Sequence, residues 1–229
     1  MEIKIEENTS NLKNRTKFFN DFYLKMLVEI CIDCHDVHGV LMFIRYMFYS
    51  FSLDEYDEQL SLVNIYYNES MEILTQIHLI FSEWKPFDKY NMGELRGAFL
   101  ELFVYELLRS VYGLEHVYQE SRIIIGDFKS YTLDFIVQLE DVFNMYECKF
   151  SVESFKRNHL NQLISIVNKY ENCNLFVIFF QPYKKVYTIF DIIQESTSNE
   201  KFQKMLDKLT IITLDDFVKN NPFLNLEYI

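Results

Sequence analysis

The chain has 229 residues, of which 49% are hydrophobic and 17% aromatic, and its formal net charge is −12. This is enough apolar material for one large domain or two small ones. The negative charge has the wrong sign for tight, unaided binding to nucleic acid, whose non-specific affinity comes mainly from lysine and arginine on phosphates. The longest apolar-rich run, residues 39–48, is too short to span a bilayer, and no secretory signal is evident at the N-terminus. We therefore expect a soluble, cytoplasmic protein with no membrane association.

The first third of the chain has helical patterning. Apolar residues recur at helical spacing over residues 15–34, and a second helix is predicted over 36–51 with Asp36 as its cap. One or two further helices are predicted over 52–84. Pro86 is the only proline in the first 180 residues and marks a junction. We predict a helical N-terminal region over 1–85 and an α/β domain over 86–229.

The remainder alternates between helix and strand patterns. An amphipathic helix is predicted over 91–113 and another over 151–170. Strand patterns rich in Ile, Val, Tyr and Phe cover 116–126, 131–139, 142–150, 174–180, 185–190 and 210–214, with a short helix predicted from residue 199. This order predicts an α/β fold with a mixed sheet flanked by helices.

Two acids and a lysine fall inside apolar strands of this region. If Glu140 and Asp141 form a two-residue turn, Asp134 and Glu147 face each other across the hairpin, with Cβ atoms ~5 Å apart. Lys149 lies two residues beyond Glu147 and so points to the same face. Buried like charges are costly without partners, and a structural role therefore explains the pattern poorly.

A divalent cation explains these residues better. Mg²⁺ favours one or two carboxylates, several waters and substrate phosphate oxygens. A lysine beside such a cation can orient an attacking water and stabilise developing negative charge. Asp134, Glu147 and Lys149 together suit phosphodiester hydrolysis.

The segment "LDFIV", followed at a short interval by "MYECK", resembles the PD-(D/E)xK nuclease superfamily, which has the restriction-endonuclease-like fold. It is similar in particular to Holliday-junction resolvases, Mrr-type restriction enzymes and antiphage nucleases. The resemblance covers roughly residues 91–190. It implies that Asp134 and Glu147 bind Mg²⁺ or Mn²⁺ and that Lys149 assists the water. Leu133 stands where many members have proline, and the subfamily is unassigned.

The same resemblance implies further site residues. The first core helix of the family often carries another acid after a glycine, which indicates Glu101, with Glu94 as the alternative. The helix after the lysine strand sometimes supplies a polar residue, and Gln162 is the candidate. Lys156 and Arg157, at the start of that helix, form either a basic edge for phosphates or a solvated helix face.

These residues imply a metal-dependent endonuclease that acts on DNA, with RNA left open. The net charge implies a partner protein or a homo-oligomer that supplies basic surface, and a role in defence or DNA processing rests on analogy. Two rival interpretations remain. One is a catalytically silent member of the fold that acts as an interaction subunit, and the other is a helical adaptor whose function lies in residues 1–85.

Two other patterns have bland explanations. "CIDCH", from Cys31 to His35, matches the haem-attachment motif, and with His38 it also suggests a zinc site. Eight consecutive residues rarely supply all four zinc ligands, and small buried cysteines near a helix end are the simpler account. The acidic run over 53–59 is either a solvated helix start or a contact for a basic partner.

Overall fold

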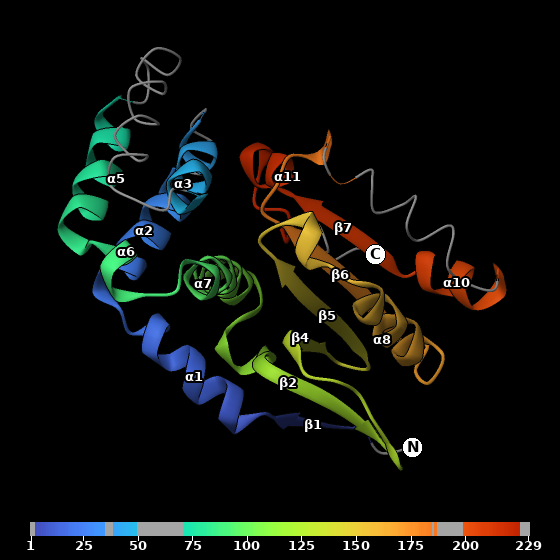
Figure 1. Ribbon diagram of the computed structural model, residues 1–229. Helices are drawn as coiled ribbons and strands as arrows, with labels where there is room; N and C mark the ends of the chain where they lie inside the picture. The colour runs from blue at the N-terminus through green and yellow to red at the C-terminus, as the bar shows by residue number, and fades with distance from the viewer. Residues whose placement is uncertain (1–2, 35–38, 50–70, 185, 187–198, 225–229) are drawn as a thin grey trace. The chain divides into compact units, whose positions relative to one another are not determined.

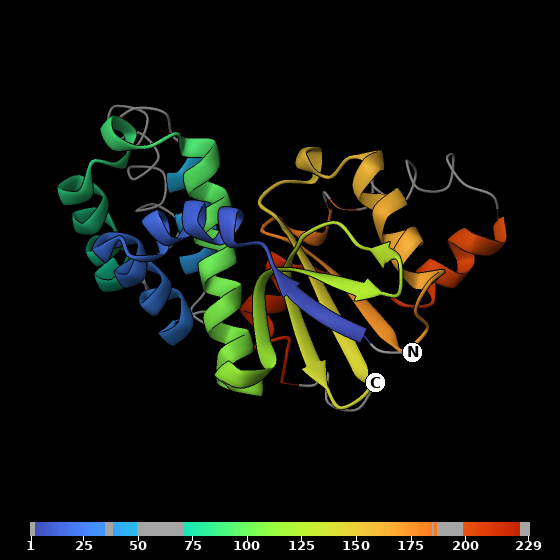
Figure 2. The ribbon, with the colours of Figure 1, turned by 90° about the horizontal axis from the view of Figure 1, so that it is seen from below.

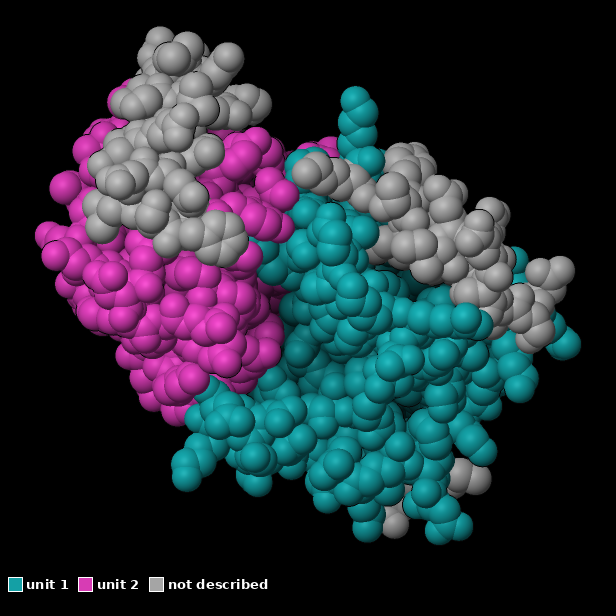
Figure 3. Space-filling model, viewed as in Figure 1, with its two compact units in different colours: residues 1–14, 108–213 teal, residues 15–107, 214–229 magenta. Residues whose placement is uncertain are grey.

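The structure is a computed structural model that describes residues 3–34, 39–49, 71–184, 186 and 199–224 (Figure 1). Contacts within the chain divide it into two compact units, coloured separately in Figure 3. Unit 1 comprises residues 1–14 and 108–213, and unit 2 comprises residues 15–107 and 214–229. Each unit therefore combines two separate stretches of the sequence.

Unit 1 is built on a mixed sheet. Its strands are β1 (Ile3–Glu7), β2 (Val117–Ile125), β3 (Phe128–Lys129), β4 (Leu133–Leu139), β5 (Val142–Lys149), β6 (Cys173–Phe179) and β7 (Leu209–Thr213). Their spatial order is β1-β2-β4-β5-β6-β7, and β3 pairs with the end of β2. The strands from β1 to β5 pair antiparallel, whereas β5, β6 and β7 run parallel.

Helices connect the parallel strands. Between β5 and β6 come the short η3 (Val152–Ser154) and α8 (Arg157–Val167), and α10 (Asn199–Leu206) precedes β7. Figures 1 and 2 show α8 and α10 on the same face of the sheet. The apolar residues of α8 pack there against the inner strands, in a core that includes Met145, Leu163, Leu175 and Val177. The sheet and its helices confirm the predicted α/β class, and they are consistent with a restriction-endonuclease-like core.

Unit 2 is helical. It contains α2 (Phe22–Asp33), α3 (Val40–Tyr49), α5 (Met71–Trp84), α6 (Pro86–Lys89) and α11 (Leu214–Lys219). The unit boundaries fall within α1 (Thr9–Phe19) and α7 (Met92–Tyr112), and η2 (Leu114–His116) follows α7. None of the helices that the structure describes is long and apolar enough to cross a membrane.

Asp21 organises the start of the helical unit. Its carboxylate accepts a hydrogen bond from the backbone N–H of Leu24 at 3.0 Å, which caps α2. It also accepts from the indole N–H of Trp84 at 3.2 Å and from the hydroxyl of Tyr90 at 2.7 Å. The hydrogen bond to Asp21 raises the pKa of the Tyr90 hydroxyl to about 12. One side chain thus joins the start of α2 to the end of α5.

The structure corrects several sequence predictions. The single helix predicted over 15–34 is two helices, because the Asp21 cap begins a new one. Strand β1 lies inside the region 1–85, which was predicted to be wholly helical. Residues 3–7 form a strand because they pair with β2, more than 100 residues later in the sequence. The division into two units does not fall at residue 85. The sheet unit includes β1 and only the last five residues of α7, and the helical unit contains residues 86–107 and 214–229.

Other predicted elements are found with shifted ends. The helix expected over 151–170 begins only at Arg157, after the 3-10 turn η3. Most of the strand expected over 185–190 lies outside the described residues, and Val186 is in a helical turn. Asp36, the expected cap, also lies outside them.

Candidate functional site

The β4–β5 hairpin has the predicted register. Leu139 pairs with Val142 across the Glu140–Asp141 turn, and Phe135 pairs with Tyr146. The next position of the same register sets Asp134 opposite Glu147. Glu140 takes a left-handed backbone with φ 51°, which closes the two-residue turn.

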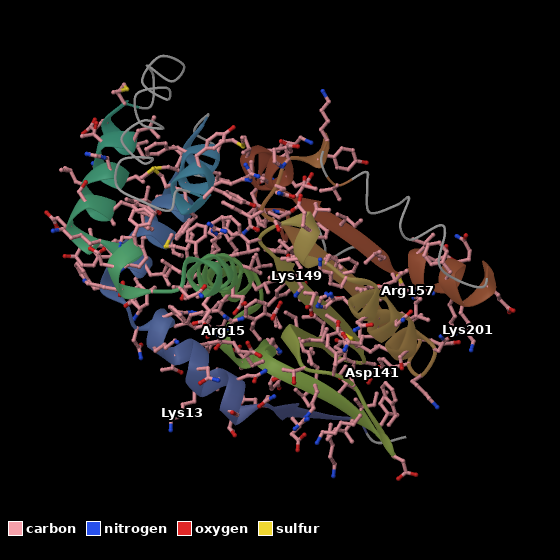
Figure 4. All side chains as sticks on the ribbon, in the orientation of Figure 1. Lys13, Arg15, Asp141, Lys149, Arg157 and Lys201 are labelled. Atoms are coloured by element: carbon pink, nitrogen blue, oxygen red, sulfur yellow. The ribbon has the colours of Figure 1, made fainter. Side chains whose placement is uncertain are left out.

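Asp134, Glu147 and Lys149 meet in the structure. The Nζ of Lys149 forms an ion pair with Oε1 of Glu147, so the two side chains share a face of the sheet. The half-buried carboxylate of Asp134 accepts a hydrogen bond from the backbone N–H of Cys148 at 2.6 Å, beside Glu147 in β5. Lys149 lies at the end of β5 in Figure 4. The constellation expected from the sequence is therefore present within unit 1.

Burial dominates the electrostatics of Glu147. The residue is only 4% exposed, and burial together with the negative charge of Asp134 raises its pKa to about 7, although Lys149 acts in the opposite direction. Burial lowers the pKa of Lys149, but the charges of Asp134 and Glu147 outweigh it and the net shift is upward. Lys149 is consequently an ammonium group at neutral pH and serves as a cation.

Tyr131 completes the buried wall of the site. Burial, together with the charges of Glu147 and Asp134, raises the pKa of its hydroxyl well above the usual value. The buried hydroxyl of Tyr131 and the buried carboxylate of Glu147 interact: Glu147 raises the pKa of Tyr131, and Tyr131 lowers the pKa of Glu147. Neither Tyr131 Oη nor Glu147 Oε2 completes a well-formed hydrogen bond among the residues that the structure describes, so this buried polar pair is incompletely satisfied.

Glu120 is a site residue that the sequence reasoning missed. In the register between β2 and β4, Gln119 pairs with Phe135 and Ser121 pairs with Leu133. The position between these two pairs sets Glu120 opposite Asp134. Carboxylate oxygens of Glu120 and Asp134 lie within 4.8 Å of each other. Three acids, Glu120, Asp134 and Glu147, therefore occupy aligned positions on three adjacent strands.

The backbone at Glu120 is unusual for a strand. Its φ is 43°, in the left-handed region, and the residue is 7% exposed. Asn11 donates a hydrogen bond to Glu120 Oε2 at 3.1 Å, and the Asn8 N–H donates to its carbonyl at 2.7 Å. A non-glycine residue keeps such a backbone only when its surroundings enforce it, and such distortions re-aim side chains near functional sites.

Glu101 and Glu94 lie on α7 in unit 2. Glu101 is buried and forms an ion pair with Arg15 at 2.6 Å. Glu94 is exposed and pairs with Lys17 at 3.4 Å. That Glu101 completes the metal site stays a prediction, and burial favours it over Glu94.

The basic edge and Gln162 belong to α8. Lys156 and Arg157 are exposed at the start of the helix, and Gln162 is half-buried within it. His159 Nδ1 accepts a hydrogen bond from the Lys156 N–H at 2.8 Å. Burial and the positive charge of Lys149 lower the pKa of His159, although Asp134 and the bond to Lys156 oppose this. Contact of Lys156, Arg157 and Gln162 with substrate stays a prediction.

The cysteine motif gains no support. Cys31 is fully buried in α2, and burial, together with Cys34, raises the pKa of its thiol well above the usual value, which opposes the thiolate that a metal needs. His35, His38 and the acidic run over 53–59 lie outside the described residues.

The buried acids fit a hard divalent cation. Mg²⁺ and Mn²⁺ prefer oxygen ligands, which Asp134 and Glu120 would offer side by side and Glu147 would offer from the adjacent strand β5. Carboxylate oxygens of Glu120 and Asp134 lie within 4.8 Å of each other, which is close enough for both to bind one such ion.

Comparisons with known proteins give no function. No protein-family model and no curated protein matches the sequence at a significant level. The crystal structure of protein VC1899 from Vibrio cholerae is similar with a TM-score of 0.48 and 12% sequence identity. The match covers 97% of this chain and 57% of that chain, so the present chain spans less than two thirds of the length of that protein.

Proposed function

We propose that the protein is a metal-dependent endonuclease that hydrolyses phosphodiester bonds in DNA, with RNA as the alternative substrate. The observation that carries the proposal is the buried Glu147, which forms an ion pair with Lys149 and lies close enough to Asp134 for that carboxylate to raise its pKa. Two neighbouring carboxylates repel each other, and a bound divalent cation would offset that repulsion.

The residues of the site have three tasks in this proposal. Asp134, Glu147 and Glu120 hold the cation, which when bound would polarise the phosphate and make its bound water more acidic. Lys149 is a half-buried ammonium that orients the attacking water and stabilises negative charge on the phosphate oxygens. The hydroxyl of Tyr131 faces the same acids and helps to fix Glu147.

Substrate binding needs help beyond this chain. Lys156 and Arg157 at the start of α8 offer cations to the phosphate backbone. With a net charge of −12, we infer that a partner protein or a second copy supplies further basic surface. A role in antiphage defence or DNA processing is part of the proposal and rests on the resemblance alone.

Cleavage of supercoiled plasmid in Mg²⁺ or Mn²⁺ tests the proposal. Wild type should nick or linearise the plasmid, whereas Lys149→Ala and Asp134→Ala should lose at least about 10²-fold in rate, as expected for loss of an electrostatic catalytic group. Asp141→Asn changes an exposed acid in the turn of the same hairpin and should cleave like wild type. Unchanged cleavage by both site variants would contradict the assignment.

A second candidate is a catalytically silent interaction subunit. Lys149 and Glu147 already neutralise each other in a direct ion pair, and the acidic net charge disfavours unaided DNA binding. If wild type binds no Mn²⁺ and cleaves neither DNA nor RNA, this second function is favoured.

A further inference from the structure

The outer faces of α2 and α5 form a groove in unit 2. The two helices run antiparallel, because Asp21 before α2 contacts Trp84 at the end of α5. Their inner faces are buried, with Leu24, Leu27 and Leu74 among the core residues. The groove between the outer faces has a volume of about 420 Å³.

The groove combines an apolar floor with an acidic rim. Met26, Ile30, Leu79 and Ile80 are its apolar lining residues, and Leu79 is 54% exposed. Phe22 is 67% exposed one helical turn before Met26, which extends the apolar stripe along α2. Large apolar side chains exposed together and bordered by polar residues are typical of interaction sites.

Three carboxylates form the rim. Glu29 and Asp33 lie on α2 and Glu83 on α5, with Gln76 as the remaining lining residue. No lysine or arginine lines the groove, and none of these three acids has an ion pair within the part of the chain that the structure describes. The lining of the groove therefore combines apolar contact area with carboxylates and contains no basic side chain.

We propose that this groove binds a basic amphipathic helix of a partner protein. A helix laid between α2 and α5 would bury apolar residues spaced i, i+4 and i+7 on the floor and set lysines or arginines against Glu29, Asp33 and Glu83. The proposal is independent of the metal site, since every residue involved lies in unit 2.

Charge selects this occupant over others. In a symmetric pairing of two copies through the groove, the same three acids would face each other, which is repulsive. An anionic lipid surface and the phosphates of a nucleic acid are also repelled by the rim. A cationic helix gains both from burial of its apolar face and from electrostatic steering.

Two synthetic peptides test the proposal. Both are helix-forming and carry leucines at i, i+4 and i+7, with lysine and arginine on the flanks of one and glutamate on the flanks of the other. The cationic peptide should bind the full-length protein saturably, and methyl NMR signals of Met26, Ile30, Leu79 and Ile80 should shift. The acidic peptide should bind at least about tenfold more weakly, a difference of about 1.4 kcal/mol.

Matched variants locate the binding. Leu79→Ser and the triple reversal Glu29→Lys/Asp33→Lys/Glu83→Lys should each weaken binding of the cationic peptide about tenfold or more. Leu114→Ser, at another exposed leucine, and Glu72→Lys/Asp88→Lys/Asp127→Lys, at exposed acids outside the groove, should leave binding unchanged.

Three results of the peptide experiments would overturn the proposal. They are no saturable binding of the cationic peptide, equal binding of the acidic one, and shifts confined to residues outside the groove. Self-association of wild type that Leu79→Ser abolishes would assign the groove to a second copy instead, and would also overturn it.

Discussion

At the scale of single residues, Glu147 is expected to make folding stability depend on pH. Its pKa rises from 4.5 to about 7 on folding, so between these values the folded state binds more protons than the unfolded state. The free energy of unfolding therefore falls as pH rises through this window, by on the order of 3 kcal/mol for a single shift of this size. Glu147→Gln removes the titration and should flatten the profile.

Urea denaturation in EDTA, at several values between about pH 4.5 and about pH 8, measures this effect. Glu115→Gln, at an exposed carboxyl, serves as the control and should keep the wild-type slope. If the stability of Glu147→Gln depends on pH as steeply as that of wild type, the raised pKa of Glu147 is contradicted.

Glu120 is expected to contribute to cation binding. Glu120→Gln keeps the shape and the capacity to accept from Asn11 but removes a charge near Asp134, and should weaken Mn²⁺ binding about tenfold or more. Electron paramagnetic resonance of free Mn²⁺ gives the affinity without any substrate. Glu140→Gln, in the exposed hairpin turn, should bind like wild type, and equal affinity of the Glu120 and Glu140 variants would remove Glu120 from the site.

The sequence predicts the acid pair Asp134 and Glu147, but it does not predict Glu120, the third acid of the candidate site. Strands β4 and β5 are joined by a two-residue turn, so counting residues outward from the turn sets Asp134 opposite Glu147. The connection from β2 to β4 contains β3 and its own turn, so no count from sequence aligns Glu120 with Asp134. The left-handed backbone of Glu120 depends on contacts with Asn8 and Asn11, which are distant in sequence.

At the scale of elements, the Asp21 cap is expected to stabilise the helical unit. Asp21→Ala removes the acceptor for the α2 N-terminus, Trp84 and Tyr90, and should lower the free energy of unfolding by about 2–4 kcal/mol. Chemical denaturation measures the change. Asp88→Ala, at an exposed acid in the first turn of α6, should cost less than about 1 kcal/mol, and similar losses in both variants would contradict the role of Asp21.

The elements themselves were predicted where local patterning decides them. Helix α7 and strands β2, β4, β5 and β6 follow strong apolar patterns, and the structure has them with shifts of a few residues. Strand β1 was missed because its five residues mix apolar and charged side chains and become a strand only by pairing with β2. The break between α1 and α2 was missed because the apolar pattern continues across Asp21, and the cap is what decides it.

At the scale of the whole molecule, each compact unit is built from two stretches that are separate in the sequence. Pro86 indicates a boundary along the chain, but the contacts assign residues 1–14 to the sheet unit and residues 214–229 to the helical unit. Such discontinuous units are set by long-range packing, which periodicity and turn residues do not report.

The acidic charge of the molecule gives a prediction about DNA. A labelled duplex should bind weakly at physiological salt, and Lys156→Ala/Arg157→Ala should reduce the slope of log affinity against log salt by about 2, one unit for each lost phosphate contact. Fluorescence anisotropy in EDTA measures the slope. The control is Lys13→Ala/Lys25→Ala, at exposed lysines on α1 and α2; Figure 4 shows Lys13 far from Arg157 within unit 1. An equal loss in both pairs would show that α8 is not a specific basic edge.

The central claim is that the acids between β2, β4 and β5 hold a divalent cation. Titration with Mn²⁺, followed by electron paramagnetic resonance, tests it most directly because no substrate or partner is needed. Wild type should bind Mn²⁺ at a discrete site, Asp134→Asn and Glu147→Gln should lose about tenfold or more in affinity, and Asp141→Asn should bind like wild type. Absence of a discrete site in wild type, or unchanged affinity in Asp134→Asn and Glu147→Gln, would contradict the claim.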